Sequence, residues 1–166
     1  MVPPVDTAEF RRIAGRFATG VTVVTTGVEG TIHGMTANAF ASLSLDPLLV
    51  LVCVDLDAGL HELLPHSRTF AVNVLAEGQE DLSRWFSSKR RPEGYSQFDG
   101  VVWVPSPVTG SPLLDGALAY LDCEVADILK GGDHSIFLGA VRDLGELGGK
   151  APLLWYESGY HRLPED

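Results

Sequence analysis

The first apolar residues of the chain recur at the spacing of a helix, and most of the later ones follow the patterns of strands. Residues 7–19 are predicted to form an amphipathic helix, because apolar side chains recur with a helical period at Phe10, Ile13, Ala14 and Phe17. Asp6 followed by Glu9 predicts a capping box at the start of this helix. Gly20 predicts its end.

From residue 21 onward, β-branched and apolar runs predict strands. Residues 21–26 and 31–37 are predicted to form a hairpin around a turn at residues 27–30. Residues 47–54 are almost wholly apolar, which predicts a strand buried on both faces of a sheet. Further strands are predicted at residues 69–75, 101–104, 117–129, 135–144 and 153–156.

Short helices are predicted at residues 59–64 and 80–87, and a polar loop at residues 89–96. Because strands outnumber helices and hairpins dominate, the pattern predicts a mainly β fold with a few helices, a largely antiparallel barrel rather than a parallel sheet. The sequence has no glycine-rich motif leading from a strand into a helix, so a Rossmann nucleotide domain is not supported. Without a repeat or a linker, residues 1–166 are expected to form a single domain.

Charge and composition narrow the classes of partner. The formal net charge of −10 disfavours nucleic acid. Residues 47–54, the longest uncharged apolar stretch, are too few to span a bilayer, and residues 1–9 lack the pattern of a secretory signal. Cys53 and Cys123 each lie in an apolar run and are expected to be buried free thiols. We therefore expect a cytoplasmic protein that binds neither nucleic acid nor membrane.

Two hydrolytic chemistries are disfavoured. His61 and His66 resemble part of a zinc-protease motif, but they are five residues apart instead of four, and Pro65 is expected to break the helix between them. No metal site is therefore expected. A Gly-x-Ser-x-Gly nucleophile motif is absent, and the apolar surroundings of Cys53 disfavour a reactive thiolate.

Residues 34–47 combine small and hydroxyl side chains with few charges, directly after a predicted strand. One interpretation is a buried turn whose polar side chains hydrogen-bond the backbone, namely Thr36, Asn38, Ser42 and Ser44. The other is a backbone-lined cradle, in which small residues let a flat heterocycle approach main-chain N–H and C=O groups. The residues by themselves leave both interpretations open.

Two shorter elements also allow a structural and a functional interpretation. The turn Gly131-Gly132-Asp133 either simply precedes a strand or holds the His134 imidazole at the rim of a pocket. The run Lys89-Arg90-Arg91 is either a solvated surface or a site that attracts a phosphate or the adenylate end of a dinucleotide.

Taken in order along the chain, several segments together resemble the flavin reductase-like family, the short-chain reductase components of two-component flavin monooxygenases. These segments are residues 17–25, 34–40, 42–47, 70–75, 132–134 and 152–156. The resemblance implies a split β-barrel of the FMN-binding type. It also implies a homodimer whose flavin groove is partly shared between the subunits.

The same resemblance implies roles for individual residues. Asn38 is expected near the reactive N5 of the flavin, and His134 and Tyr156 are expected to meet the nicotinamide, which makes Asn38 and His134 the candidate catalytic residues. The flavin site is expected to comprise Met35, Thr36, Ala37, Asn38, Ala39, Ser42, Leu43, Ser44, Cys53, Val54, Asp55, Phe86, Ser87 and Lys89. Relatives usually carry a serine- and threonine-rich stretch for the phosphate where this chain has residues 55–60, which leaves the phosphate contacts open.

The implied activity is hydride transfer from NADH or NADPH to FMN or FAD, with the reduced flavin passed to a partner monooxygenase. One alternative is a flavoprotein that retains its flavin and reduces another substrate. Another is a non-catalytic flavin- or haem-binding module on the same barrel. The sequence does not distinguish FMN from FAD or NADH from NADPH, and it does not identify the partner oxygenase.

Overall fold

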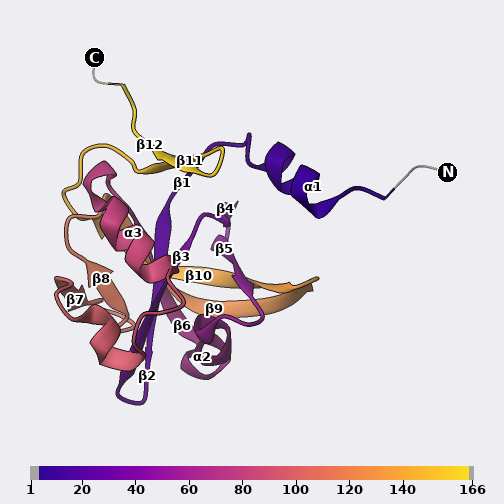
Figure 1. Cartoon of the computed structure of the whole chain (residues 1–166). Coiled ribbons are helices and arrows are strands. Elements are labelled where there is room, and N and C mark those ends of the chain that lie inside the picture. Colours follow the sequence, from indigo (N-terminus) through magenta and orange to yellow (C-terminus); the bar gives the residue numbers. More distant parts are fainter. Residues whose placement is uncertain (1–3, 165–166) are drawn as a thin grey trace.

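A seven-stranded antiparallel sheet forms the body of the molecule, in the order β3-β2-β6-β9-β10-β5-β4 (Figure 1). The computed structural model describes residues 4–164. The strands of this sheet are β2 (Thr22–Val28), β3 (Thr31–Ala37), β4 (Phe40–Leu45), β5 (Leu48–Asp55), β6 (Thr69–Val74), β9 (Ala119–Gly131) and β10 (His134–Glu146).

Smaller elements surround the sheet. A second sheet has the order β1-β11-β12, and β7 pairs with β8 in a separate ribbon. These strands are β1 (Thr19–Gly20), β7 (Trp103–Pro105), β8 (Pro112–Leu114), β11 (Leu154–Tyr156) and β12 (Gly159–His161). The helices are α1 (Thr7–Ala14), α2 (Gly59–Ser67) and α3 (Glu80–Ser87), with 3-10 turns η1 (Glu77–Gln79) and η2 (Gly94–Phe98). Within residues 4–164, no helix has the length and apolar character needed to cross a membrane.

The mainly β class with a few helices is confirmed. β3 and α3 have the predicted bounds, and β9 and β10 form the predicted long hairpin, in which His134 pairs with Gly131. The short strands β1, β4, β8 and β12 were not predicted. Runs this short carry little periodicity, and their extended conformation depends on the partner strand.

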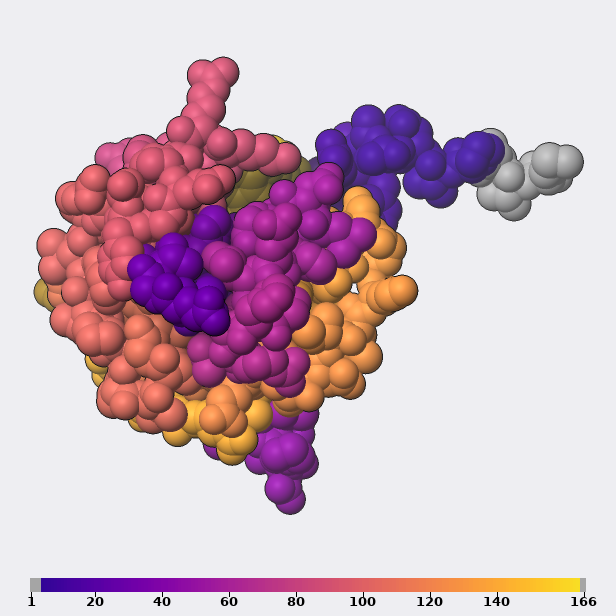
Figure 2. Space-filling view, turned by 90° about the horizontal axis from the view of Figure 1, so that it is seen from below, coloured from indigo at the N-terminus to yellow at the C-terminus, as the bar shows by residue number. Residues whose placement is uncertain are grey.

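The N-terminal helix is shorter than predicted. α1 ends at Ala14, and the backbone N–H of Gly15 donates to Arg11 O at 2.9 Å, so Gly15 and not Gly20 ends the helix. Asp6 takes the N-cap position without a capping side-chain hydrogen bond, so the predicted capping box does not form. None of the residues of α1 is buried, and α1 stands away from the body of the molecule (Figure 2). Its apolar face therefore has no partner within the described chain.

The prediction that residues 47–54 are buried on both faces is wrong. In β5, Val50, Val52 and Val54 are buried, whereas the residues between them are only half-buried. Side chains alternate between the two faces of a strand, and here only one face lies against the core. Apolar side chains on the other face made the sequence look like a fully buried strand.

The prediction that Pro65 breaks the second helix is also wrong, because α2 continues through it to Ser67. Leu60 and Leu64 are fully buried one turn apart on this helix. Their burial outweighs the backbone hydrogen bond that proline cannot make. Arg68 then ends the helix in the left-handed conformation, with φ 59°.

Two clusters of buried side chains hold these elements together. One joins the large sheet to α2 and includes Phe70, Phe137 and Leu64. The other lies beneath α3 and includes Phe86 and Leu153. Since Phe86 is fully buried, α3 is held firmly against the sheet beside β3. This contact positions the surface on which the candidate site is built.

Candidate functional site

Two adjoining cavities lie between β3 and α3. The larger has a volume of about 380 Å³ and the smaller about 240 Å³. Thr36 and Ser87 line both cavities, so the two adjoin along these residues, and we refer to them together as the groove. The larger cavity falls within the size range of small-molecule sites.

The floor of the groove comes from the end of β3 and the short break that follows it. His33 and Met35 line the larger cavity, and Ala37 and Asn38 line the smaller one. β3 ends at Ala37 and β4 begins at Phe40, so Asn38 and Ala39 are free of regular pairing between these strands. The carbonyl of Ala39 accepts the N–H of Cys53 at 3.0 Å, which ties this break to β5.

α3 forms the opposite wall and is fixed to β3 by specific contacts. The Thr36 hydroxyl donates to Ser83 O at 2.7 Å. The ring of Phe86 lies so close to Gly34 that a Cβ there would come within 2.6 Å of Phe86 Cε1. Glycine at this position therefore lets helix and strand approach closely. The groove keeps its width because these two elements are locked together.

The smaller cavity has an aromatic wall contributed by the C-terminal sheet. Trp155 and Tyr160 line it and meet edge to face, with ring centroids 4.9 Å apart. The Tyr160 hydroxyl lies 2.8 Å from Ser83 Oγ, at hydrogen-bond distance. Arg84 lies 4.8 Å above the centre of the Tyr160 ring. This wall is therefore held rigidly against α3.

The larger cavity has a cationic wall built on Arg91. The Arg91 guanidinium donates to Ser88 O at 2.6 Å and to Gly34 O at 2.7 Å, and lies 3.3 Å from His33 Nε2. Gln97, which is fully buried, contacts the other ring nitrogen of His33 at 3.2 Å. Burial, with a smaller contribution from the Arg91 charge, lowers the pKa of His33 to about 4. The imidazole is therefore neutral near pH 7 and adds no positive charge beside Arg91.

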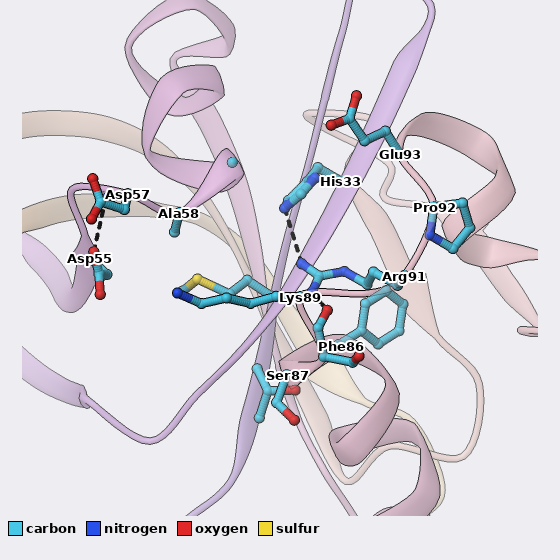
Figure 3. Close-up of a pocket in the computed structure, with 14 residues that line it drawn as sticks. His33, Asp55, Asp57, Ala58, Phe86, Ser87, Lys89, Arg91, Pro92 and Glu93 are labelled. Atoms are coloured by element: carbon cyan, nitrogen blue, oxygen red, sulfur yellow. Dashed lines mark hydrogen bonds between the residues drawn. The ribbon is translucent and has the colours of Figure 1, made fainter.

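The other wall of the larger cavity is acidic. Asp55 ends β5, and its Oδ1 accepts the backbone N–H of Asp57 at 2.8 Å. Figure 3 shows Asp55 and Asp57 on one side of the cavity, His33 and Arg91 on the other, and Lys89 between them. Glu93 also lines the cavity, on the side of His33, so the cavity holds charges of both signs.

Many of the predicted flavin-site residues come together around this groove. The larger cavity is lined by Met35, Thr36, Asp55, Phe86, Ser87 and Lys89, and the smaller by Thr36, Ala37, Asn38 and Ser87. The predicted residues outside both cavities are Ala39, Ser42, Leu43, Ser44, Cys53, Val54, His134 and Tyr156.

The outlying residues occupy different surroundings. Val54 is fully buried in the core, so only its backbone is available to a ligand. Ser42, Leu43 and Ser44 lie on β4 at the edge of the large sheet. Cys53 is half-buried, and burial raises the pKa of its thiol. It is a free cysteine, as is the buried Cys123.

The two predicted nicotinamide residues lie apart. His134 pairs with Asp55 across β10 and β5, so it stands beside the acidic wall, with Nδ1 2.8 Å from Asp133 Oδ1. Tyr156 packs edge to face with His161, at 5.8 Å between ring centroids. Its neighbour Trp155 is the residue of β11 that lines the smaller cavity.

Several residues of the groove were not predicted as site residues: His33, Asp57, Arg91, Trp155 and Tyr160. His33 carried a usable signal, because it lies two residues before Met35 on a predicted strand and so shares its face. Arg91 belongs to the basic run for which a phosphate or adenylate site was one of two predicted interpretations. Trp155 and Tyr160 reach the groove only through tertiary packing.

Comparison with known proteins identifies the family of this chain. Residues 14–164 match the family described as flavin reductase like domain. This chain belongs to that family. The match confirms the resemblance to the flavin reductase-like family that the ordered segments of the sequence had indicated.

Individual members of the family match over most of the chain. An NADH-dependent FAD reductase of Streptomyces globisporus is 50% identical over 141 residues, covering 85% of this chain and 77% of the relative. The reductase subunit HsaB of a flavin-dependent monooxygenase of Mycobacterium tuberculosis is 41% identical over 162 residues, covering 96% of this chain and 84% of the relative. Among solved structures, the Streptomyces globisporus NADH:FAD oxidoreductase SgcE6, in complex with NAD and FAD fragments, matches with a TM-score of 0.91 and 43% identity, covering 100% of this chain and 98% of the other.

Proposed function

We propose that this protein is an NADH-dependent flavin reductase that transfers a hydride from NADH to a free flavin, with FAD as the flavin it takes best. The observation that carries the proposal is the groove over Thr36, which has charged side chains of both signs at one end and aromatic side chains at the other. Relatives named NADH-dependent FAD reductase and NADH-dependent flavin reductase support both substrates.

The residues present suit a flavin. The floor at Ala37 and Asn38 offers small side chains and backbone groups to a flat ring, and the shared Thr36 and Ser87 lie along the path to the larger cavity. Lys89 and Arg91 in that cavity suit the anionic tail of the flavin. When bound, the flavin supplies the ring that accepts the hydride.

The protein's own task is to position two rings and to exclude water. Hydride transfer needs the nicotinamide C4 and the flavin N5 at near-attack distance, on the order of 3–3.5 Å. Asn38 is proposed to hydrogen-bond the flavin near N5 as charge develops there. His134, at the start of β10, is proposed to orient the nicotinamide. The reaction requires no general acid, so these positioning groups suffice.

A kinetic assay tests the activity. NADH oxidation by the purified protein should depend on added FAD or FMN and saturate as either flavin is raised, because a reductase treats flavin as a substrate. Oxidation that is independent of added flavin would indicate a flavoprotein that retains its flavin. Failure to oxidise NADH or NADPH with either flavin would contradict the enzyme assignment.

We propose that the recipient of the reduced flavin is a flavin-dependent monooxygenase. Relatives named as reductase subunits and components of such enzymes support this. A dialysis membrane between this reductase and a flavin-dependent monooxygenase should still allow hydroxylation, since only the small flavin has to cross. Hydroxylation that requires both proteins in one compartment would contradict transfer by diffusion.

We also propose a homodimer of split β-barrels. Phe10, Ile13 and Phe17 of the N-terminal segment are 64%, 53% and 79% exposed, and Leu45 at the end of β4 is 87% exposed. Exposed apolar side chains gathered on projecting segments favour burial against a second copy. Light scattering should give twice the monomer mass, and an active monomer at micromolar concentration would contradict the dimer.

The barrel assignment follows from the two edges of the large sheet. β3 and β4 are its edge strands, yet only two residues separate the end of one from the start of the other. This short connection between the two edges of the sheet supports a split barrel. We propose that residues 1–166 form one such domain. We also propose that the protein works in the reducing cytoplasm, because Cys53 and Cys123 are free thiols.

A further inference from the structure

We propose that Asp55 and Asp57 make the larger cavity select against the phosphate monoester of FMN, so that this enzyme distinguishes flavins by the charge of their tail. This inference rests on the proposed flavin reductase function. It concerns the segment after β5, where two carboxylates line the cavity that also holds Lys89 and Arg91.

The charges that line the cavity leave it slightly negative. Its cations are Lys89 and Arg91, and its carboxylates are Asp55, Asp57 and Glu93. His33 contributes no positive charge at neutral pH, because burial and Arg91 lower its pKa to about 4. A ligand group with two negative charges is therefore opposed more strongly than a group with one.

The backbone of the segment reinforces this preference. The N–H of Leu56 donates to Asp133 O at 3.1 Å, and the N–H of Ala58 donates to Asp55 O at 3.0 Å. The N–H of Asp57 donates to the Asp55 carboxylate at 2.8 Å. Successive N–H groups before a helix are common phosphate ligands, but here they are already used within the protein. The Asp55 carboxylate accepts the Asp57 N–H, which is therefore not free to donate to a phosphate oxygen.

The tails of the three common flavins differ in the charge of their phosphate groups. The terminal phosphate of FMN is a monoester and carries close to two charges at neutral pH. Each phosphate of FAD carries one ester bond, one anhydride bond and a single charge, and the second phosphate lies farther along the tail. Riboflavin has no phosphate. Hydroxyl groups of the adenosine ribose can also donate to Asp55 or Asp57, which accept hydrogen bonds.

Binding of the three flavins to wild type and variants tests the proposal. Quenching of flavin fluorescence should give a Kd for FMN about tenfold higher than for FAD, equivalent to about 1.4 kcal/mol. Asp55→Asn combined with Asp57→Asn should remove most of this difference by tightening FMN, while riboflavin stays within about twofold. Added salt should weaken the wild-type discrimination, because charge–charge interactions are screened.

Two further variants keep the test decisive. Asp57→Asn alone preserves the turn, because the hydrogen bond of the turn is donated by the Asp57 backbone N–H and does not involve the Asp57 carboxylate. This single variant should reduce the difference between the dissociation constants of FMN and FAD only in part. Glu62→Gln removes one exposed carboxylate from α2 outside the cavity and should leave the FMN-to-FAD ratio unchanged.

Contrary outcomes are equally clear. An unchanged FMN-to-FAD ratio in the double variant, or an equal gain for riboflavin and FMN, would overturn the proposal. Both results are compatible with a working reductase. Failure of the wild-type protein to bind any flavin or to oxidise NADH would instead overturn the proposed function.

Discussion

The backbone of Gly34 lies directly against the ring of Phe86. A Cβ at residue 34 would stand 2.6 Å from Phe86 Cε1 and 2.7 Å from Cδ1. Phe86 is fully buried and also borders the larger cavity, so its ring has little room to move. The strand that forms the floor of the groove and the helix that forms its wall are thus packed backbone to ring.

We predict that Gly34→Ala destabilises the protein and weakens flavin binding together. The added methyl must displace Phe86, and overpacking of this kind typically costs about 1–3 kcal/mol. Urea denaturation and flavin titration measure the two effects. Gly27→Ala on β2 is the matched control, because its Cβ would meet Ile32 Cγ2 at an ordinary 3.4 Å. Equal stability of the two variants would show that Phe86 yields at no cost.

Stability should decrease in mild acid because of His33. The pKa of His33 is lowered to about 4 in the native protein by burial and by Arg91, from an ordinary value of 6.5. Between pH 6.5 and 4, His33 is protonated in the unfolded chain but stays neutral in the native protein. The free energy of unfolding therefore decreases as the pH is lowered through this range. Above pH 6.5 this contribution is constant.

His33→Gln removes this titration. The variant should lose less stability than wild type when denaturation at pH 7 is compared with denaturation at pH 5, because glutamine cannot bind the proton. His66→Gln changes an exposed histidine on α2 and should behave like wild type. A pH dependence in His33→Gln equal to that of wild type would contradict the role assigned to His33.

Asn38→Ala should slow hydride transfer more than it weakens flavin binding. Loss of a donor to developing charge in a dry site costs about 2–4 kcal/mol, and the exposure of Asn38 places the expected loss at the lower end, roughly thirtyfold in rate. Stopped-flow reduction of bound flavin by NADH measures it directly. A single-turnover rate equal to wild type would show that Asn38 only shapes the break between β3 and β4.

His134→Ala should raise the KM for NADH and leave flavin affinity nearly unchanged. The ring is oriented by Asp133 at 2.8 Å, and this hydrogen bond lowers the pKa of Asp133. Substitution by asparagine should recover part of the loss if a hydrogen bond to the nicotinamide is what matters. Joint loss of thermal stability and flavin affinity, without a selective change in KM, would mean that His134 only packs at the end of the sheet.

The comparison of sequence with structure shows which signals are reliable. β3, α3 and the β9–β10 hairpin were predictable because each satisfies its own pattern of period, length and turn residues. α1 was predicted too long because its apolar face has nothing to pack against in the described chain. The predicted helix break at Pro65 was wrong because the burial of Leu60 and Leu64 stabilises α2 by more than the proline destabilises it.

The mainly β class and the family could be predicted from the sequence alone, because both depend on patterns of neighbouring residues. The sequence also pointed to the segment of Thr36 and Asn38, which lines the groove. Only the tertiary structure brought His33, Arg91 and Gln97 into one network and set Asp55 and Asp57 across from it. It also placed Trp155 and Tyr160 against α3. The physical reason is that the charge and shape of a cavity arise from side chains distant in sequence, and their separation depends on how the sheet and helices pack.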